Sequence, residues 1–197
     1  MLVTKQIEID MSHRVFQHKS KCFSPHGHRY FIEVGVDDKI IDIKGDSSEG
    51  MVIDFSDLKE IMMLVLDKNY DHGVVISDKD YIFKYCLVDS LKLLEDEEVC
   101  NIIKNKIPKF KELLEQYNKD KKRHWKINII NSIPTAENLA KHWFFLINLE
   151  LLEKGISLKY IKVWETPTST AIYTSDDARK ETDKNQKTLQ QYPMKKW

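Results

Sequence analysis

The stretch "KCFSPHGHRYFIEVGV", Lys21–Val36, places a cysteine and two histidines directly before an alternating apolar run. Successive side chains of a strand point to opposite faces, so His26 and His28 project from one face, and Gly27 between them permits close backbone approach. The residues that continue this parity are Tyr30, Ile32, Val34 and Val36. The stretch therefore predicts a strand that buries one face and carries both histidines at its beginning.

A second alternating run precedes it and ends at another histidine. Ile7, Ile9, Met11 and His13 share parity from Lys5 onward. If the two strands pair as antiparallel neighbours, His13 lies close to His26 and His28. Three neutral imidazoles provide three corners of a tetrahedral Zn²⁺ site and leave the fourth for water or substrate. A His-x-His pair alone is a weak signal, because a histidine on an apolar strand is more often a core or surface residue. The third histidine in phase strengthens the metal hypothesis.

Cys22 has three interpretations on sequence alone. It lies beside Lys21 and close to the expected metal, and both favour the thiolate. As a fourth ligand it would close the site, and as an acid/base group it would act beside the metal. The third interpretation is an exposed thiol without a role.

Two further segments carry chemically useful groups. In "NYDHG", Asp71 and His72 are either ordinary turn residues or a histidine whose charged form a carboxylate stabilises. In "VWETPT", Glu165 shares parity with Ile161 and Val163, and a carboxylate on such a face needs donors. A heterocycle with adjacent N–H groups would provide them in a bidentate contact, and a salt bridge to a lysine or arginine is the alternative.

The rest of the chain predicts an α+β order of two strands, helix, helix and two strands. Leu58, Ile61, Met62 and Val65 follow helical spacing behind a cap at Asp54 or Ser56. A second helix begins at "PTAEN", with an apolar stripe from Leu139 to Leu151 and a C-cap at Gly155. "ISLKYIKVWET" and "STAIYTS" predict the last two strands. Residues 50–55 predict another short strand.

An insertion over about 73–131 separates the two helices. We expect short strands at its two ends, "VVIS" and "WKINIIN". We expect the charged segment 81–117 between them to be helical. The tail 176–197 has few apolar residues, so we expect it to be loosely ordered.

Composition limits the classes of partner. Lys+Arg and Asp+Glu are both 31, so no global basic field indicates a nucleic-acid or anionic membrane partner. No apolar run approaches the roughly 20 residues of a membrane span. The N-terminal segment lacks a secretory layout and the 3 cysteines lack framework spacing, so we expect reduced thiols and a cytoplasmic protein.

Six spaced motifs together resemble the 6-pyruvoyl-tetrahydropterin synthase family, and they cover most of residues 5–174. They are "MSHRV", "C-x-x-x-H-G-H", "GMVIDFSDLK", "DH", "PTAEN" and "WET". The cysteine spacing is most similar to the branch called 6-carboxytetrahydropterin synthase, of queuosine biosynthesis. The resemblance implies a T-fold, a four-stranded antiparallel sheet with two helices on one face, as a single domain over 1–175. It also implies a homohexamer with sites at subunit interfaces.

The resemblance also implies a role for each candidate residue. His13, His26 and His28 would bind zinc, and Cys22 would be the general base. Asp71 and His72, from a neighbouring subunit, would be the partner acid/base pair, and Glu165 would bind the pterin ring.

The implied substrate is 7,8-dihydroneopterin triphosphate, and the products are 6-carboxytetrahydropterin, acetaldehyde and triphosphate. A 6-pyruvoyl-forming enzyme and a non-catalytic zinc- and pterin-binding module are the alternatives. Arg14, Lys19 and Lys21 are candidates for contact with the triphosphate, although a solvated loop is the simpler interpretation. Glu137 ranks below Glu165, because a carboxylate in a first helical turn also suits the helix dipole.

Overall fold

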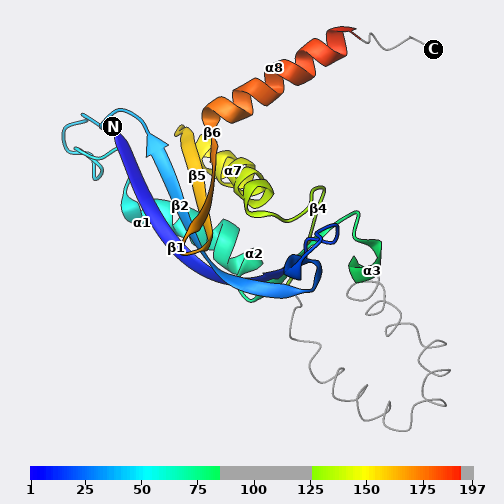
Figure 1. Cartoon of the computed structure of the whole chain (residues 1–197). Coiled ribbons are helices and arrows are strands. Elements are labelled where there is room, and N and C mark those ends of the chain that lie inside the picture. Colours follow the sequence, from blue (N-terminus) through cyan, green and yellow to red (C-terminus); the bar gives the residue numbers. More distant parts are fainter. Residues whose placement is uncertain (85–125, 192–197) are drawn as a thin grey trace, which may run out of the picture. The chain divides into compact units, whose positions relative to one another are not determined.

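The computed structural model describes residues 1–84 and 126–191 (Figure 1). The strands are β1 (Leu2–His13), β2 (His26–Asp37), β3 (Gly73–Ser77), β4 (Ile127–Ile130), β5 (Leu158–Thr166) and β6 (Ser169–Thr174). The helical segments are η1 (Lys21–Phe23), α1 (Phe55–Met62), the π-helical η2 (Met63–Asp67), α2 (Lys68–Tyr70), α3 (Tyr81–Lys84), α7 (Ala136–Glu153) and α8 (Ser175–Gln191). Most of the helix predicted within the insertion lies outside the described residues.

The strands form one mixed sheet in the order β4-β3-β1-β2-β5-β6. Antiparallel pairing of β2 with β5 and of β5 with β6 agrees with the prediction. The prediction of four antiparallel strands was wrong, because β3 pairs in parallel with both β1 and β4. The two short strands predicted at the ends of the insertion therefore belong to the sheet itself. Their pairing satisfies backbone groups that β1 would otherwise leave exposed along one edge.

The described chain divides into two compact units. The first comprises Met1–Asp10, His28–Asp71 and Thr135–Trp197, and the second comprises Met11–Gly27 and His72–Pro134. The core of the first is an aromatic cluster around Trp143, which is fully buried. Its ring meets those of Tyr30 and Tyr70 edge-on, at centroid distances of 6.1 and 5.5 Å. Edge-to-face packing is a favourable geometry for aromatic rings, so this cluster fixes α2 and α7 around β2.

Both predicted helices form where the apolar spacing places them. The four positions Leu58, Ile61, Met62 and Val65 are all buried, and the α7 stripe is buried from Leu139 to Leu151. Asp54 caps α1 by accepting from Ser56 N–H at 2.6 Å. Gly155 has φ +73°, which confirms the predicted glycine stop after α7.

The predicted strand over 50–55 was wrong. Gly50 has φ +84° and ends a local loop in which Met51 accepts from Ile41 N–H at 2.8 Å. Asp54 already caps α1, so Val52 and Ile53 form only a short buried link between the loop and the helix.

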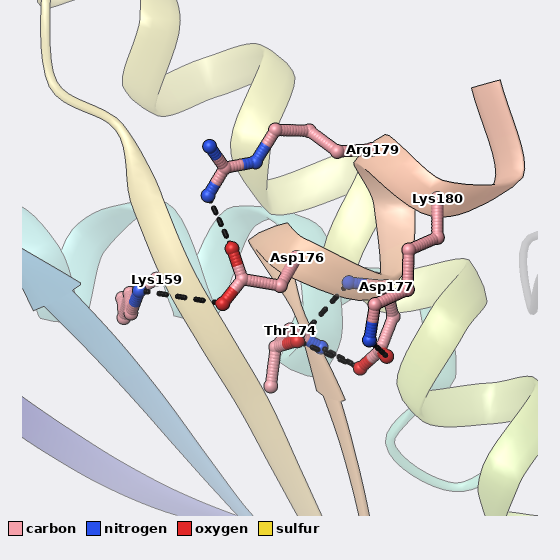
Figure 2. A network of polar contacts seen from close by, with 6 residues as sticks. All are labelled: Lys159, Thr174, Asp176, Asp177, Arg179 and Lys180. Carbon is pink, nitrogen blue, oxygen red and sulfur yellow. Dashed lines mark hydrogen bonds and ion pairs between the residues drawn. The ribbon is translucent and has the colours of Figure 1, made fainter. Parts of the chain in front are cut away.

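The tail expected to be loosely ordered instead begins as helix α8. Thr174 and Asp177 form a reciprocal capping box, in which Thr174 N–H donates to Asp177 Oδ2 at 3.1 Å and Asp177 N–H donates to Thr174 Oγ1 at 3.2 Å (Figure 2). Asp176 also forms ion pairs with Lys159 of β5 and with Arg179 (Figure 2). The Thr-x-x-Asp sequence was the available signal for this helix start.

In the second unit the end of β1 pairs with β3. The partners are Met11 with Gly73, Ser12 with Val74 and His13 with Val75. Val75, Ile76 and Ile130 are buried, so the short strands contribute apolar side chains to this unit as well as hydrogen bonds.

The capping box predicts a pH-dependent helix start. The Thr174 hydrogen bonds lower the pKa of Asp177 below its ordinary 3.8, so the carboxylate stabilises α8 above that pH and loses this effect as the pH falls through the lowered pKa. Asp177→Ala should shift the NMR signals of the first turn of α8 toward coil at neutral pH, with little difference from the parent at strongly acidic pH. Asp183→Ala, at an exposed position in the same helix, is the control. Equal first-turn helicity in D177A and the parent at neutral pH would contradict the capping role.

Candidate functional site

Three histidines come together at the end of β1 and the beginning of β2. One donor nitrogen from each of His13, His26 and His28 lies within 4.8 Å of the other two. His13 is buried and the other two are half-buried. The rings of His13 and His26 are 4.5 Å apart between centroids. The group can therefore offer three imidazoles to one ion from a partly enclosed position.

Backbone carbonyls fix the orientation of two of these rings. The Nδ1 of His13 lies 2.6 Å from the Pro134 carbonyl oxygen, and the Nδ1 of His26 lies 2.8 Å from that of Ser24. A carbonyl can only accept, so each Nδ1 carries the proton and each Nε2 keeps its lone pair. This is the arrangement that metal-binding histidines adopt in proteins. The donor set suits a divalent transition-metal ion such as zinc.

Gly27 permits the close approach that its position predicted. A Cβ at this residue would lie 3.1 Å from the Met11 carbonyl oxygen, closer than most side-chain contacts. The glycine thus leaves room for the backbone of β1 beside the two histidines of the His-Gly-His motif.

Cys22 lies in η1, in the loop between the two ligand-bearing strands. Its thiol is free and half-buried, and its carbonyl oxygen accepts from Val15 N–H at 2.9 Å. Within residues 1–84 and 126–191, the histidine group includes neither a cysteine nor a carboxylate. The interpretation of Cys22 as a fourth ligand therefore has no geometric support, and an acid/base role stays a prediction.

Asp71 and His72 lie between α2 and β3. Asp71 Oδ1 accepts from the backbone N–H of Asp10 at 2.8 Å, which fixes the carboxylate against β1. His72 is exposed and has φ +55°, in the left-handed region that non-glycine residues seldom adopt. Residues held in such conformations concentrate at functional sites. Histidine is among the non-glycine residues enriched in this region, so an ordinary turn accounts for the conformation as well, and the acid/base role of His72 stays a prediction.

Glu165 is half-buried near the end of β5. It lies beside a fully buried tyrosine, since Tyr30 donates its hydroxyl to Glu165 Oε1 at 3.4 Å. At 3.4 Å this contact is longer than an ordinary O–H···O hydrogen bond, and a role for Glu165 in binding the pterin ring stays a prediction.

Two polar pairs were missed by the sequence reasoning. The Tyr70 hydroxyl and His142 Nε2 form a hydrogen bond of 2.8 Å, and burial lowers the pKa of His142 and raises that of Tyr70 to about 12. Arg14, considered for the triphosphate, instead forms an ion pair with buried Asp80. Neither pair has a local sequence signal, because its members are far apart in the chain.

Comparison with known proteins gives a family match over nearly the whole described fold. The model of the family described as 6-pyruvoyl tetrahydropterin synthase matches residues 2–176. A Rickettsia conorii protein named 6-carboxy-5,6,7,8-tetrahydropterin synthase is 28% identical over 165 residues, which cover 83% of this chain and 93% of that protein. A Haemophilus influenzae protein of the same name is 26% identical over 171 residues, covering 87% and 96%.

Solved structures agree on the fold. An uncharacterized protein from Wolinella succinogenes matches with a TM-score of 0.61 at 20% identity, covering 89% of this chain and 98% of that one. The Caenorhabditis elegans 6-pyruvoyl tetrahydropterin synthase matches with a TM-score of 0.52 at 20% identity, covering 89% and 95%. At this identity the likeness concerns the fold alone.

The histidine group predicts a metal site that depends on all three rings. Single His13→Ala and His26→Ala variants should lose most of the zinc bound by the parent, because each removes one of three ligands. His18→Ala, at an exposed histidine in the connecting loop, is the matched control and should keep its zinc. Metal content after exhaustive dialysis, measured by inductively coupled plasma mass spectrometry, tests this. Full zinc occupancy in both ligand variants would contradict the assignment.

Proposed function

This chain belongs to the 6-pyruvoyl tetrahydropterin synthase family, and on that premise we propose that it is a zinc-dependent lyase acting on 7,8-dihydroneopterin triphosphate. The proposed products are 6-carboxytetrahydropterin, acetaldehyde and triphosphate. The observation that carries the proposal is the group of three histidines with Nδ1 of His13 and His26 directed at carbonyl oxygens. Its curated relatives named 6-carboxy-5,6,7,8-tetrahydropterin synthase support the carboxy product.

The three histidines would bind zinc through one nitrogen each and leave a position open toward substrate. Bound zinc supplies a Lewis acid that lowers the pKa of coordinated hydroxyl groups and stabilises negative charge on oxygen. The carbonyl contacts of His13 and His26 keep their rings in the ligating tautomer without rearrangement.

Cys22 would take a proton from the substrate side chain next to the oxygen that becomes negative. Its place in the loop between the ligand-bearing strands puts it close in sequence to His26. A cysteine side chain in this loop could accept that proton as the general base.

His72 would return a proton on the other face of the substrate, and Asp71 would stabilise the charged imidazole. In the proposed homohexamer this pair comes from a neighbouring subunit. The left-handed backbone at His72 is compatible with this role.

Glu165 would bind the pterin ring. Adjacent ring N–H groups match a carboxylate in a bidentate, charge-assisted contact. The Tyr30 hydroxyl contacts the same carboxylate from β2, the strand that neighbours β5 in the sheet.

The competing function is formation of a 6-pyruvoyl product on the same scaffold. The family is named for 6-pyruvoyl tetrahydropterin synthase, which favours the pyruvoyl product. The names of the curated relatives and the spacing of Cys22 before the His-Gly-His motif favour the carboxy product.

We also propose that the enzyme acts in the cytoplasm and that its product supplies queuosine biosynthesis. Within the described part of the chain, no helix is long and apolar enough to cross a membrane.

Product identity tests the proposed reaction. The zinc-loaded parent incubated with 7,8-dihydroneopterin triphosphate should yield a 6-carboxy pterin and acetaldehyde, identified by mass spectrometry. Cys22→Ala should lose at least about a hundredfold in kcat while keeping zinc, since general-base contributions of 10²–10⁴ are typical. A 6-pyruvoyl product would transfer the assignment to the competing function. Unchanged substrate with folded, zinc-loaded parent protein would favour a binding module, and a fully active C22A would remove Cys22 from the mechanism.

Glu165 predicts an effect on pterin binding. Glu165→Gln keeps the side-chain volume but loses the charge that pairs with ring N–H donors, so the KM should rise by roughly tenfold or more. Glu33→Gln is the matched control, because Glu33 accepts from Tyr160 and Gln6 instead of Tyr30. Steady-state kinetics of both variants give the comparison. Equal KM values in E165Q, E33Q and the parent would exclude Glu165 from ring recognition.

A further inference from the structure

Arg14 directly follows the predicted ligand His13 and is enclosed in the second unit. Its Nε lies 3.2 Å from Oδ2 of Asp80, and the two side chains are 12% and 3% exposed. Removing two charges from water is costly unless they stay paired. The ion pair therefore fixes Arg14 to the turn that follows β3.

Two phenylalanine rings flank the guanidinium. Arg14 Cζ lies 4.7 Å from the ring centroid of Phe23 and 5.7 Å from that of Phe83. Both distances permit cation–π attraction, which strengthens when the cation is desolvated. Phe23 remains 52% exposed with this contact in place, so one face of its ring meets the guanidinium while much of the side chain faces solvent.

These contacts reach η1, the short helical segment that contains Cys22. Phe23 adjoins Cys22 in η1, and the Cys22 carbonyl accepts from the N–H of Val15, which adjoins Arg14. Consecutive residues, Arg14 and Val15, thus contact consecutive residues, Cys22 and Phe23. That double contact holds the backbone of the loop at Cys22.

Asp80 is itself fixed by its local backbone. Its N–H donates to the Ser77 carbonyl at 3.0 Å, and its Oδ1 accepts from Phe83 N–H at 3.2 Å at the start of α3. One carboxylate therefore caps a helical turn and pairs with Arg14. Both Asp80 and Phe83 belong to the insertion that separates the two main helices in sequence.

We propose that Arg14 is a positioning residue for Cys22, held by Asp80 and Phe83, so that the first residues of the insertion set the place of the thiol. This inference rests on the proposed function only where it concerns turnover. The contacts themselves predict that Cys22 reactivity depends on Arg14 and Asp80, whatever the substrate is.

The test compares Arg14→Gln, Asp80→Asn and the double variant. Lys154→Gln is the matched control, since it removes a surface ion pair with Asp57. The first measurement is the rate of Cys22 alkylation by iodoacetamide at fixed pH, followed on the Cys22 peptide by mass spectrometry. The second is kcat and KM with 7,8-dihydroneopterin triphosphate, with zinc content and folding as checks. Phe23→Leu keeps the ion pair and removes the ring, and serves if the buried variants do not fold.

Each single variant should change the alkylation rate and lower kcat by roughly 10- to 100-fold, with a much smaller change in KM, as expected for a misplaced catalytic group. Because Arg14 and Asp80 act as one unit, the double variant should be no worse than the poorer single variant. Folded, zinc-loaded single variants that alkylate Cys22 at the parental rate would overturn the proposal, as would additive losses in the double variant. A parent without turnover would refute the proposed function alone, because the alkylation rates still report on Cys22.

Discussion

The candidate site depends on the hydrogen bond between His13 Nδ1 and the Pro134 carbonyl oxygen, at 2.6 Å. It fixes the tautomer of a buried histidine and so decides which nitrogen is available as a ligand. It also connects the end of β1 to the residue before Thr135, the N-cap of α7. The first hydrogen bond of the helix goes from Leu139 N–H to the Thr135 carbonyl, so the Pro134 carbonyl lies before the helix and can accept from the ring. Pro134 therefore precedes the start of α7 and also orients His13, a proposed metal ligand.

Strand parity explains why the ligands and the core occur together. Along β2, the same alternation that buries Tyr30, Ile32 and Val34 directs His26 and His28 to that face. A shift of one residue in register would turn the histidines and the apolar side chains to the opposite face together. The free energy of burying the core therefore also maintains the geometry of the histidine group.

Much of the architecture could be predicted because its causes are local. Helical spacing identified α1 and α7, a capping aspartate and a stop glycine marked their ends, and alternation identified β1, β2, β5 and β6. The parallel pairing of β3 was not predicted, since pairing direction depends on how distant segments meet. α8 was not predicted, because its sequence has few apolar side chains to bury and its start is marked only by the Thr174–Asp177 cap. For the site, periodicity brought three histidines together correctly, whereas the backbone conformation of His72 has no sequence signature.

The Arg14–Asp80 pair shows why polar contacts escape sequence reasoning. In the sequence, Arg14 is one of several cationic residues near a loop, and Asp80 has the appearance of an ordinary turn residue after β3. Only the parallel pairing of β1 with β3 brings the residues after the two strands near each other, with His13 opposite Val75. Once they are near, burial makes separation costly, so the pair couples the loop of Cys22 to the turn that begins the insertion. The unpredicted strand pairing and the unpredicted ion pair therefore have a common origin. An insertion that begins with a strand of the sheet is positioned to support the loop beside the histidines.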